Sequence, residues 1–435
     1  MKKNYQTSPA AASIDELKLP EAVTLAMTDL AGAVKEGLLA LAVGAGLQVM
    51  QLMMEEDVTG LAGVKGRHDP NRVATRHGTE DGSVTLGGRR VPVRRPRVRS
   101  ADGRREIPVP AYEAFSSTEI LDQLALERMM AKLSTRRYPA GLEPVGAQVA
   151  ATATSTSKSA VSRRFVARTE KALAEMMAAD LSGLDLVALM FDGVHFGEHC
   201  CVVGLGIGID GTKHPLGVVE GSSENATVVT ELLTGLRDRG LDVTRPVLVT
   251  IDGAKALAAA VNAVFDHPVI HRCQLHKIRN VENKLPKSMA STVTKKMRAA
   301  YRNENALAAE AELEALARQL AKPHPGAAAS LREGLAETLT VNRLGVPPTL
   351  ARTLRSTNAI ESMIEICRDH STNVKRWRDG QMALRWCAAG MGEAAKQFRK
   401  VNGFLHLPAL RTALNAHVAA ETVTATVYNE EEAAA

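Results

Sequence analysis

The sequence predicts an α/β protein in which helices cover a mixed five-stranded sheet and an all-α segment interrupts the sheet-forming part. The first observation is a series of five apolar, strand-length runs within residues 184–270, with amphipathic helical segments between the later runs. A three-stranded meander followed by strand–helix alternation is typical of a mixed sheet covered by helices. The second observation is a strongly helical stretch over residues 278–345, which separates these strands from the last helices.

The five predicted strands are short and largely apolar. They are residues 184–192, 200–209, 215–219, 246–252 and 269–270, and the helices between them are residues 225–239 and 254–265. The first and fourth strands each end in a carboxylate, Asp192 and Asp252. Ligand sites in open sheets usually lie at the carboxyl ends of strands, so these two residues are candidates for a functional site.

The segment before the sheet is predicted to be mainly helical with a small β hairpin. Residues 20–56 have helical spacing, whereas residues 60–82 are rich in Gly and charged residues and are predicted to be a loop. Two β-prone runs flank Gly87-Gly88 and predict a hairpin over residues 83–99. Residues 141–170 combine helix, short break and helix, which resembles a helix-turn-helix.

Positive charge is concentrated in this N-terminal segment. Between Leu61 and Pro110, twelve Lys and Arg oppose five Asp and Glu, an excess larger than the net charge of +6 of the whole chain. Such a concentration indicates a polyanion-binding surface, with a solvated basic loop as the alternative. Basic residues alternate along the hairpin, which puts several on one face as candidate phosphate contacts: Arg89, Arg90, Arg94, Arg95, Arg97 and Arg99.

The second helix of the helix-turn-helix-like segment is a further candidate DNA contact. In that motif the N-terminal part of the second helix enters the major groove, although many helical hairpins without this function have the same pattern. The candidate residues at this position are Lys158, Ser159, Ser162, Arg163 and Arg164.

Composition excludes several other classes of protein. Aromatic residues make up only 3% of the chain, too few for a protein built on base-stacking platforms. Five cysteines in 435 residues do not form a disulfide scaffold, and no apolar run is long enough to span a bilayer. We therefore expect a cytoplasmic protein that is not associated with a membrane.

Asp192 and Asp252 have the properties of metal ligands if their strands are neighbours. Two close carboxylates repel each other unless a cation lies between them, and an all-oxygen ligand set favours Mg²⁺ or Mn²⁺. A pair of such ions can activate an entering oxygen and stabilise a leaving one. The alternative is that each Asp-Gly pair simply forms a turn.

A third carboxylate is available after the helical insertion. Glu361 lies in Ser356-Thr357-Asn358-Ala359-Ile360-Glu361, 109 residues after Asp252. Its position three residues after Asn358 also resembles a capping box, so Glu361 has an alternative structural role. Glu365, one helical turn further on the same face, is the competing candidate ligand.

The combined motifs resemble the Mutator-type transposases of bacterial insertion sequences. The resemblance rests on Phe191-Asp192-Gly193, Thr250-Ile251-Asp252-Gly253, residues 271–280 (HRCQLHKIRN) and residues 356–361 (STNAIE), in this order and spacing. It covers roughly residues 60–400. It implies a ribonuclease H-like core, interrupted by an α-helical insertion, with Asp192, Asp252 and Glu361 as catalytic residues that hold two Mg²⁺ or Mn²⁺ ions.

Three other residues attract attention near these motifs. Cys273 and His276 match the family's Cys-x-x-His after the second Asp; a structural zinc site would need four ligands, and we favour a packing role or contact with the DNA strand. Trp377 lies among basic residues, where it either stacks on a base or packs between helices.

The expected domains follow these changes in composition. They are a flexible tail (1–20), a DNA-binding region (21–182), the first part of the core (183–283), the α-helical insertion (284–354), the final core helices (355–418) and a disordered tail (419–435).

The expected function is that of a transposase. It would bind the terminal inverted repeats and target DNA as double-stranded partners, act as a homodimer or larger assembly, and catalyse metal-dependent cleavage and strand transfer. The alternatives are a catalytically inactive, transposase-derived DNA-binding protein and a ribonuclease H-like nuclease.

Overall fold

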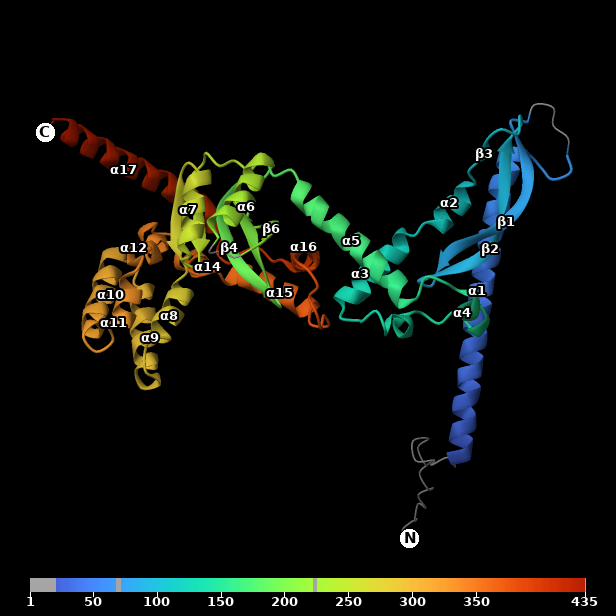
Figure 1. Cartoon of the computed structure of the whole chain (residues 1–435), viewed down its shortest axis with the longest axis horizontal. Helices are drawn as coiled ribbons and strands as arrows, with labels where there is room; N and C mark the ends of the chain where they lie inside the picture. Colours follow the sequence, from blue (N-terminus) through green and yellow to red (C-terminus); the bar gives the residue numbers. More distant parts are fainter. Residues whose placement is uncertain (1–20, 68–71, 222–224, 435) are drawn as a thin grey trace, which may run out of the picture. The chain divides into compact units, whose positions relative to one another are not determined.

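The computed structural model describes residues 21–67, 72–221 and 225–434, so the predicted flexible tail over residues 1–20 lies outside the described residues. The chain divides into two compact units (Figure 1). Unit 1 comprises Met1–Arg128 and Ser134–Arg164, and unit 2 comprises Met129–Leu133 and Phe165–Ala435.

Unit 1 contains a long helix and a three-stranded antiparallel sheet. Helix α1 (Glu21–Ala62) packs Met54 and Val58 against the sheet formed by β1 (Ala74–Leu86), β2 (Arg89–Ser100) and β3 (Glu106–Ile107). The β1–β2 turn is Gly87-Gly88, whose φ values of 56° and 74° favour glycine.

The hairpin is longer than the sequence predicted. Residues 74–82 belong to β1 and not to a loop. Their charged side chains meet the arginines of β2, as in the pairs Glu80–Arg95 and Asp81–Arg94. This cross-strand pairing stabilises a strand that has no apolar alternation to reveal it.

Short helices complete unit 1. They are α2 (Pro110–Ser116), α3 (Glu119–Met130), a 3₁₀ turn (Tyr138–Gly141) and α4 (Ala147–Thr152), followed by α5 (Lys158–Ala178), which continues into unit 2. The predicted helix, break and helix over residues 141–170 are therefore present, with the break at residues 153–157. Backbone hydrogen bonds between Arg90 and Thr154 tie this break to the hairpin.

Unit 2 contains the predicted mixed five-stranded sheet, in the order β6-β5-β4-β7-β8. The strands are β4 (Leu186–Phe196), β5 (His199–Gly208), β6 (Lys213–Glu220), β7 (Val247–Ile251) and β8 (Pro268–Arg272). Strands β4, β7 and β8 are parallel, whereas β5 and β6 pair antiparallel to their neighbours.

Strand β4 does not end at Asp192 as the sequence predicted. It continues to Phe196 because residues after Asp192 pair with β5 in a hairpin, a long-range feature that apolar runs do not reveal. Only its parallel pairing with β7 stops earlier, at the pair Met190–Thr250.

Helices cover both faces of this sheet. Leu189 and Phe191 of β4 belong to a core with α6 (Ala226–Asp238) and α7 (Lys255–Val264). Met190 and Val194 belong to the opposite core, with α15 (Asn358–His370) and α16 (Gly380–Gln397). The alternation follows from the two-residue period of a strand.

The helical insertion has a core of its own. It begins with α8 (Gln274–Glu282) and α9 (Lys287–Arg302), and Figure 1 shows α8 to α12 grouped beside the sheet. The other helices of this core are α10 (Ala306–Ala321), α11 (Pro325–Arg332) and α12 (Leu335–Thr338). The next two, α13 (Thr340–Arg343) and α14 (Pro348–Leu354), contribute Val341 and Leu350 to the core that includes α15 and α16.

The chain ends in a helix. After a 3₁₀ turn (Phe404–His406), α17 spans Leu407–Ala434, so residues 419–434 are helical where we expected a disordered tail. The acidic and alanine-rich composition of this segment suggested disorder, but Glu and Ala are also strong helix formers. Within the described ranges, no helix combines the length and apolarity that crossing a membrane requires.

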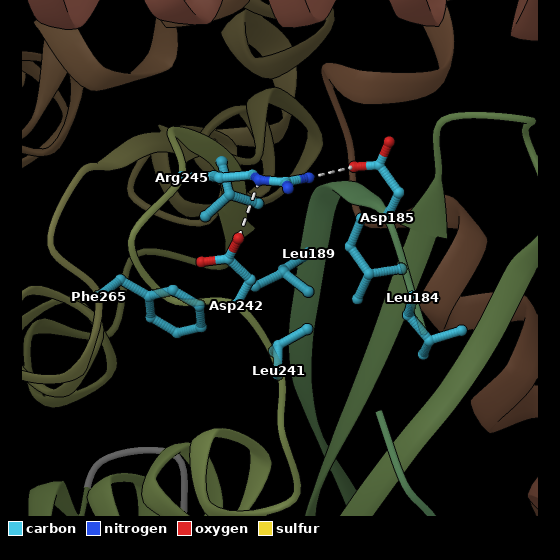
Figure 2. Close-up of a pocket in the computed structure, with 9 residues that line it drawn as sticks. Leu184, Asp185, Leu189, Leu241, Asp242, Arg245 and Phe265 are labelled. Carbon is cyan, nitrogen blue, oxygen red and sulfur yellow. Dashed lines mark hydrogen bonds and ion pairs between the residues drawn. The ribbon is translucent and has the colours of Figure 1, made fainter. Parts of the chain in front are cut away.

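The amino ends of β4 and β7 are closed by ion pairs. Arg245 contacts Asp185 at 3.4 Å and Asp242 at 2.8 Å over a cavity of about 10 Å³ (Figure 2). That volume is about one water molecule, so this cavity is too small for a larger ligand.

Candidate active site

Asp192 lies in β4, and Asp252 directly follows the neighbouring parallel strand β7. Met190 of β4 pairs with Thr250 of β7. Asp192 is two residues after Met190, and Asp252 is two residues after Thr250. Residues two apart point to the same face, and adjacent strands are about 4.8 Å apart. By this alternation Asp252 is on the same face as Asp192, which is the face that α15 covers, and its charge raises the pKa of Asp192.

Helix α15 carries Glu361 to this face. Its buried residues Ile360, Met363 and Ile364 pack into the core shared with β4. The Glu361 side chain, 30% exposed, lies at the edge of that core. Glu365 is exposed. The carboxylates whose charge affects Asp192 are Asp252 and Glu361, so the geometry favours Glu361 over Glu365 as the third member.

The capping role considered for Glu361 differs from the observed contacts. The N-cap of α15 is Thr357, not Asn358. The hydroxyl of Thr357 donates a hydrogen bond to Glu361 Oε1 at 3.0 Å, which holds the carboxylate at the first turn of the helix. Thr357 was not singled out from the sequence, although it directly precedes Asn358 in the motif over residues 356–361.

Burial and mutual repulsion dominate the electrostatics. Burial, with smaller contributions from the charges of Asp252 and Glu361, raises the pKa of Asp192 to about 6. The Gly193 amide, 2.8 Å from Asp192 Oδ1, and nearby His276 act in the opposite direction. A desolvated carboxylate next to two others is an environment in which a cation would be stabilised.

The donor chemistry fits Mg²⁺ or Mn²⁺, since all three side chains offer carboxylate oxygens. The side chains are not gathered into a ready ligand cluster: among the described residues, no group of three His, Cys, Asp or Glu is close enough to hold an ion. Asp252 Oδ1 accepts a hydrogen bond from the Ala254 amide at 2.9 Å, and Asp192 is similarly bonded to Gly193.

Cys273 and His276 lie directly beside Glu361. The buried Cys273 sulfur is 3.4 Å from the Thr357 hydroxyl, and His276 Nδ1 is 3.4 Å from the same hydroxyl. His276 Nε2 is 3.6 Å from Glu361 Oε1. Burial alone would raise the pKa of Cys273, but hydrogen bonds with His276 and Thr357 outweigh it and lower that pKa.

The same contacts act on His276 in the opposite sense. Its hydrogen bond with Cys273 raises the pKa of the His276 imidazole, against the effect of burial, and Asp192 and Glu361 add to this rise. His276 is therefore favoured as a cation next to the carboxylates.

The predicted hairpin arginines in unit 1 are mostly engaged within that unit. Arg97 forms ion pairs with Glu80 and Glu106, and Arg90 donates to the Ser116 carbonyl and to Ser83. Arg89, Arg94 and Arg95 also have partners, which are the Glu143 carbonyl, Asp81 and Glu80. Within the described part of the chain, Arg99 alone of the six makes no side-chain hydrogen bond or ion pair.

The candidate DNA contacts at the start of α5 are mostly exposed, unlike the paired arginines of the hairpin. The side chains of Lys158, Ser159, Ser162 and Arg163 are exposed, whereas Arg164 is largely buried, 3.3 Å from Asp122 and bonded to the Ser155 carbonyl. Four of the five candidates are thus accessible, and Arg164 is bound to its own unit.

Trp377 packs against other aromatic residues. Its ring centroid is 4.9 Å from that of Phe196 and 6.3 Å from that of Trp386. It is partly buried against the core that includes α15 and α16, which favours the packing interpretation over base stacking.

Comparison with known proteins identifies the family. A model of the Mutator family of transposases matches residues 25–401. The transposase for insertion sequence element IST2 of Acidithiobacillus ferrooxidans is 32% identical over 40% of this chain, and the match spans 58% of that relative's length.

Two further relatives extend the similarity. The transposase for insertion sequence element IS6120 of Mycolicibacterium smegmatis is 30% identical over 52% of this chain and 70% of its own length. The transposase for insertion sequence element ISRM5 of Rhizobium meliloti is 24% identical over 83% of this chain and 90% of its own length. Since the family model covers most of the sequence, the chain belongs to the Mutator family of transposases.

Proposed function

We propose that this protein is a DNA transposase with a ribonuclease H-like core, in which Asp192, Asp252 and Glu361 hold two Mg²⁺ or Mn²⁺ ions. The observation that supports the proposal most directly is the shared face of Asp192 and Asp252 on parallel neighbouring strands, with Glu361 brought to it by α15. When bound, such ions would activate an entering oxygen and stabilise the charge on a leaving oxygen.

In this mechanism the protein's own residues set the environment of Asp192, orient Glu361 and balance part of the negative charge. The surrounding core partly desolvates Asp192, and the Thr357 hydroxyl orients Glu361. His276 compensates part of the negative charge between turnovers. Water first attacks the phosphodiester at the element's end and leaves a 3′-hydroxyl, and that hydroxyl then attacks the target strand.

The DNA partners in this proposal are the terminal inverted repeats and the target duplex. The exposed residues at the start of α5 would contact the repeats, and basic residues of unit 1 would contact phosphates. Because two ends must be joined to one target, we propose a homodimer or larger assembly.

Single carboxylate substitutions test the catalytic assignment. Asp192→Ala, Asp252→Ala and Glu361→Ala should each abolish end cleavage and leave end binding nearly intact, because these groups hold metal and do not contact bases. Gel-shift and cleavage assays on one DNA carrying the terminal repeat measure both, with Glu365→Ala as the matched control. Substantial cleavage by any of the three variants would falsify the assignment.

Strand-transfer products separate the transposase from the two alternatives. A ribonuclease H-like nuclease would cut without joining ends to a target. A catalytically inactive, DNA-binding relative would bind the repeats and yield neither cut nor joined DNA.

A further inference from the structure

A basic pocket lies between the helical insertion and the start of α15. It has a volume of about 620 Å³ and is lined from α8, α9, α14 and the first residues of α15. Asn358 lines it, and Glu361 lies one helical turn further along α15. The pocket is therefore adjacent to the candidate active site, within the same unit.

Four arginines provide the charge of this pocket. Arg298 and Arg302 are one turn apart on α9, and Arg352 and Arg355 are three apart on α14 and at its end. The described residues that line the pocket include no Asp or Glu. Among the residues that the structure describes, none of the four guanidinium groups has a hydrogen bond or ion pair, in contrast to the hairpin arginines of unit 1.

Of the four arginines, Arg355 gives the strongest indication of an anionic ligand. Its Nε is buried and has no hydrogen-bond partner among the described residues. Burial lowers the pKa of the Arg355 guanidinium, and Glu304, which does not line the pocket, offsets this only in part. A buried donor without an acceptor costs free energy, which an anionic ligand would recover.

The other lining residues and the volume of the pocket limit the size and the chemical class of the ligand. The lining also includes apolar side chains, those of Leu275, Ile278 and Pro348, and the largely buried ring of Tyr301, whose hydroxyl is already bonded to Thr338. A pocket of this volume holds a small ligand, not a double helix. Phosphates at the arginines and a base or sugar on the apolar side chains match one or two nucleotides of an unpaired strand.

We propose that this arginine pocket binds unpaired nucleotides of the DNA strand beside the cleavage site. The inference rests on the proposed function for its choice of DNA, but it concerns binding and not catalysis. It assigns the insertion a role in holding a strand end next to Glu361.

Equilibrium binding by the full-length chain tests this proposal. Fluorescence anisotropy in EDTA measures the affinity for a blunt duplex and for the same duplex with a three-nucleotide single-stranded overhang. A second measurement tests whether thymidine monophosphate competes with the overhang duplex. Arg298→Ala/Arg352→Ala is the test variant. Arg237→Ala/Arg318→Ala, which removes the same charge from exposed positions of unit 2 outside the pocket, is the matched control.

The wild type and the control should prefer the overhang duplex, and the pocket variant should lose this preference with about tenfold weaker overhang binding. Its salt slope on that probe should fall by about 1.4, for two single-strand phosphates. Equal weakening on both duplexes, or an unchanged preference, would overturn the proposal. Displacement of the overhang duplex by thymidine monophosphate at a concentration equal to that of the oligonucleotide would also overturn the proposal, because it would indicate a mononucleotide site. Because this assay measures binding and not cleavage, failure here is distinct from failure of the catalytic assignment.

Discussion

Thr357 occupies a position through which three side chains of the candidate site are connected. Its hydroxyl donates to Glu361 and lies 3.4 Å from both the Cys273 sulfur and His276 Nδ1. Its backbone amide is also 3.5 Å from that sulfur. Thr357 thereby links the start of α8, which carries Cys273 and His276, to the first turn of α15. We regard it as a positioning residue for Glu361.

Removing this hydroxyl should reduce catalysis without affecting DNA binding. We expect Thr357→Val, which keeps the side-chain shape, to lower the cleavage rate by about 10- to 100-fold, a range typical of residues that orient metal ligands. Thr357→Ser retains the donor and should recover most of the rate. Single-turnover cleavage rates and gel-shift affinities are the measurements. Equal loss in both variants would show that packing, and not the hydroxyl, matters.

His271 is a buried titratable group in β8, opposite Thr250 of β7. Burial lowers its pKa from 6.5 to about 4, and the charges of Arg355 and Arg343 add to the decrease. Between pH 6.5 and 4 the unfolded chain therefore binds a proton at this residue that the folded chain does not. The free energy of unfolding should fall by up to about 3 kcal/mol as the pH decreases through this window, and the cost is absent above it.

His271→Leu should remove that contribution. Urea denaturation between pH 4.5 and 7.5 would then show a shallower decrease of the unfolding free energy in the variant than in the wild type. The comparison variant is His267→Leu, an exposed position just before the same strand. If His271→Leu keeps the full wild-type slope, other groups account for the acid sensitivity.

At the scale of elements, the structure separates two kinds of basic segment. The hairpin arginines are largely paired with Glu80, Asp81 and Glu106, so much of the positive excess seen in the sequence is neutralised within unit 1. The start of α5 is exposed, and of its basic residues only Arg164 has an internal ion pair among those that the structure describes. Helix α5 is therefore the better candidate for sequence-specific contacts.

Substitution of α5 and of the hairpin should affect DNA binding in different ways. Lys158→Ala/Arg163→Ala should weaken binding to the terminal repeat by about 1–3 kcal/mol for each hydrogen-bonded base that the variant no longer reaches, and should change binding to a scrambled duplex little. Arg99→Ala in β2 should weaken both duplexes equally and reduce the salt slope by about 0.9. Titrations of both DNAs at several salt concentrations measure this. Equal weakening by the α5 variant would place end recognition elsewhere.

The elements differ in how far their sequence predicts them. The strands of unit 2 were recognisable because they are buried runs of Val, Leu and Ile bounded by turns. The first part of β1, residues 74–82, was missed because charge pairs with β2, and not apolar alternation, stabilise it. The extent of β4 beyond Asp192 depends on its pairing with β5, which no local pattern encodes.

At the scale of the whole molecule, the candidate site depends on contacts between distant parts of the chain. Asp192, Asp252 and Glu361 could be proposed from motif context, since the two aspartates end apolar, strand-length runs and Glu361 lies in the motif over residues 356–361. Thr357 and the four pocket arginines could not, because their roles arise from how α8, α9 and α14 pack around α15. Helical spacing places Arg298 and Arg302 on one face but does not say which partner helix that face meets.

Metal dependence is a property of the complete protein and tests the proposed chemistry as a whole. The charges of Asp252 and Glu361 contribute to the raised pKa of Asp192, so we expect a metal cation to stabilise the three carboxylates and end cleavage to require Mg²⁺ or Mn²⁺. Ca²⁺ is larger and accepts looser coordination, so it should support the protein–DNA complex without efficient cleavage. The measurement is a cleavage assay on terminal-repeat DNA with each ion in turn, alongside a gel shift. Full cleavage in excess EDTA would exclude the metal mechanism, whereas loss of the complex in Ca²⁺ would mean that Mg²⁺ serves assembly as well as chemistry.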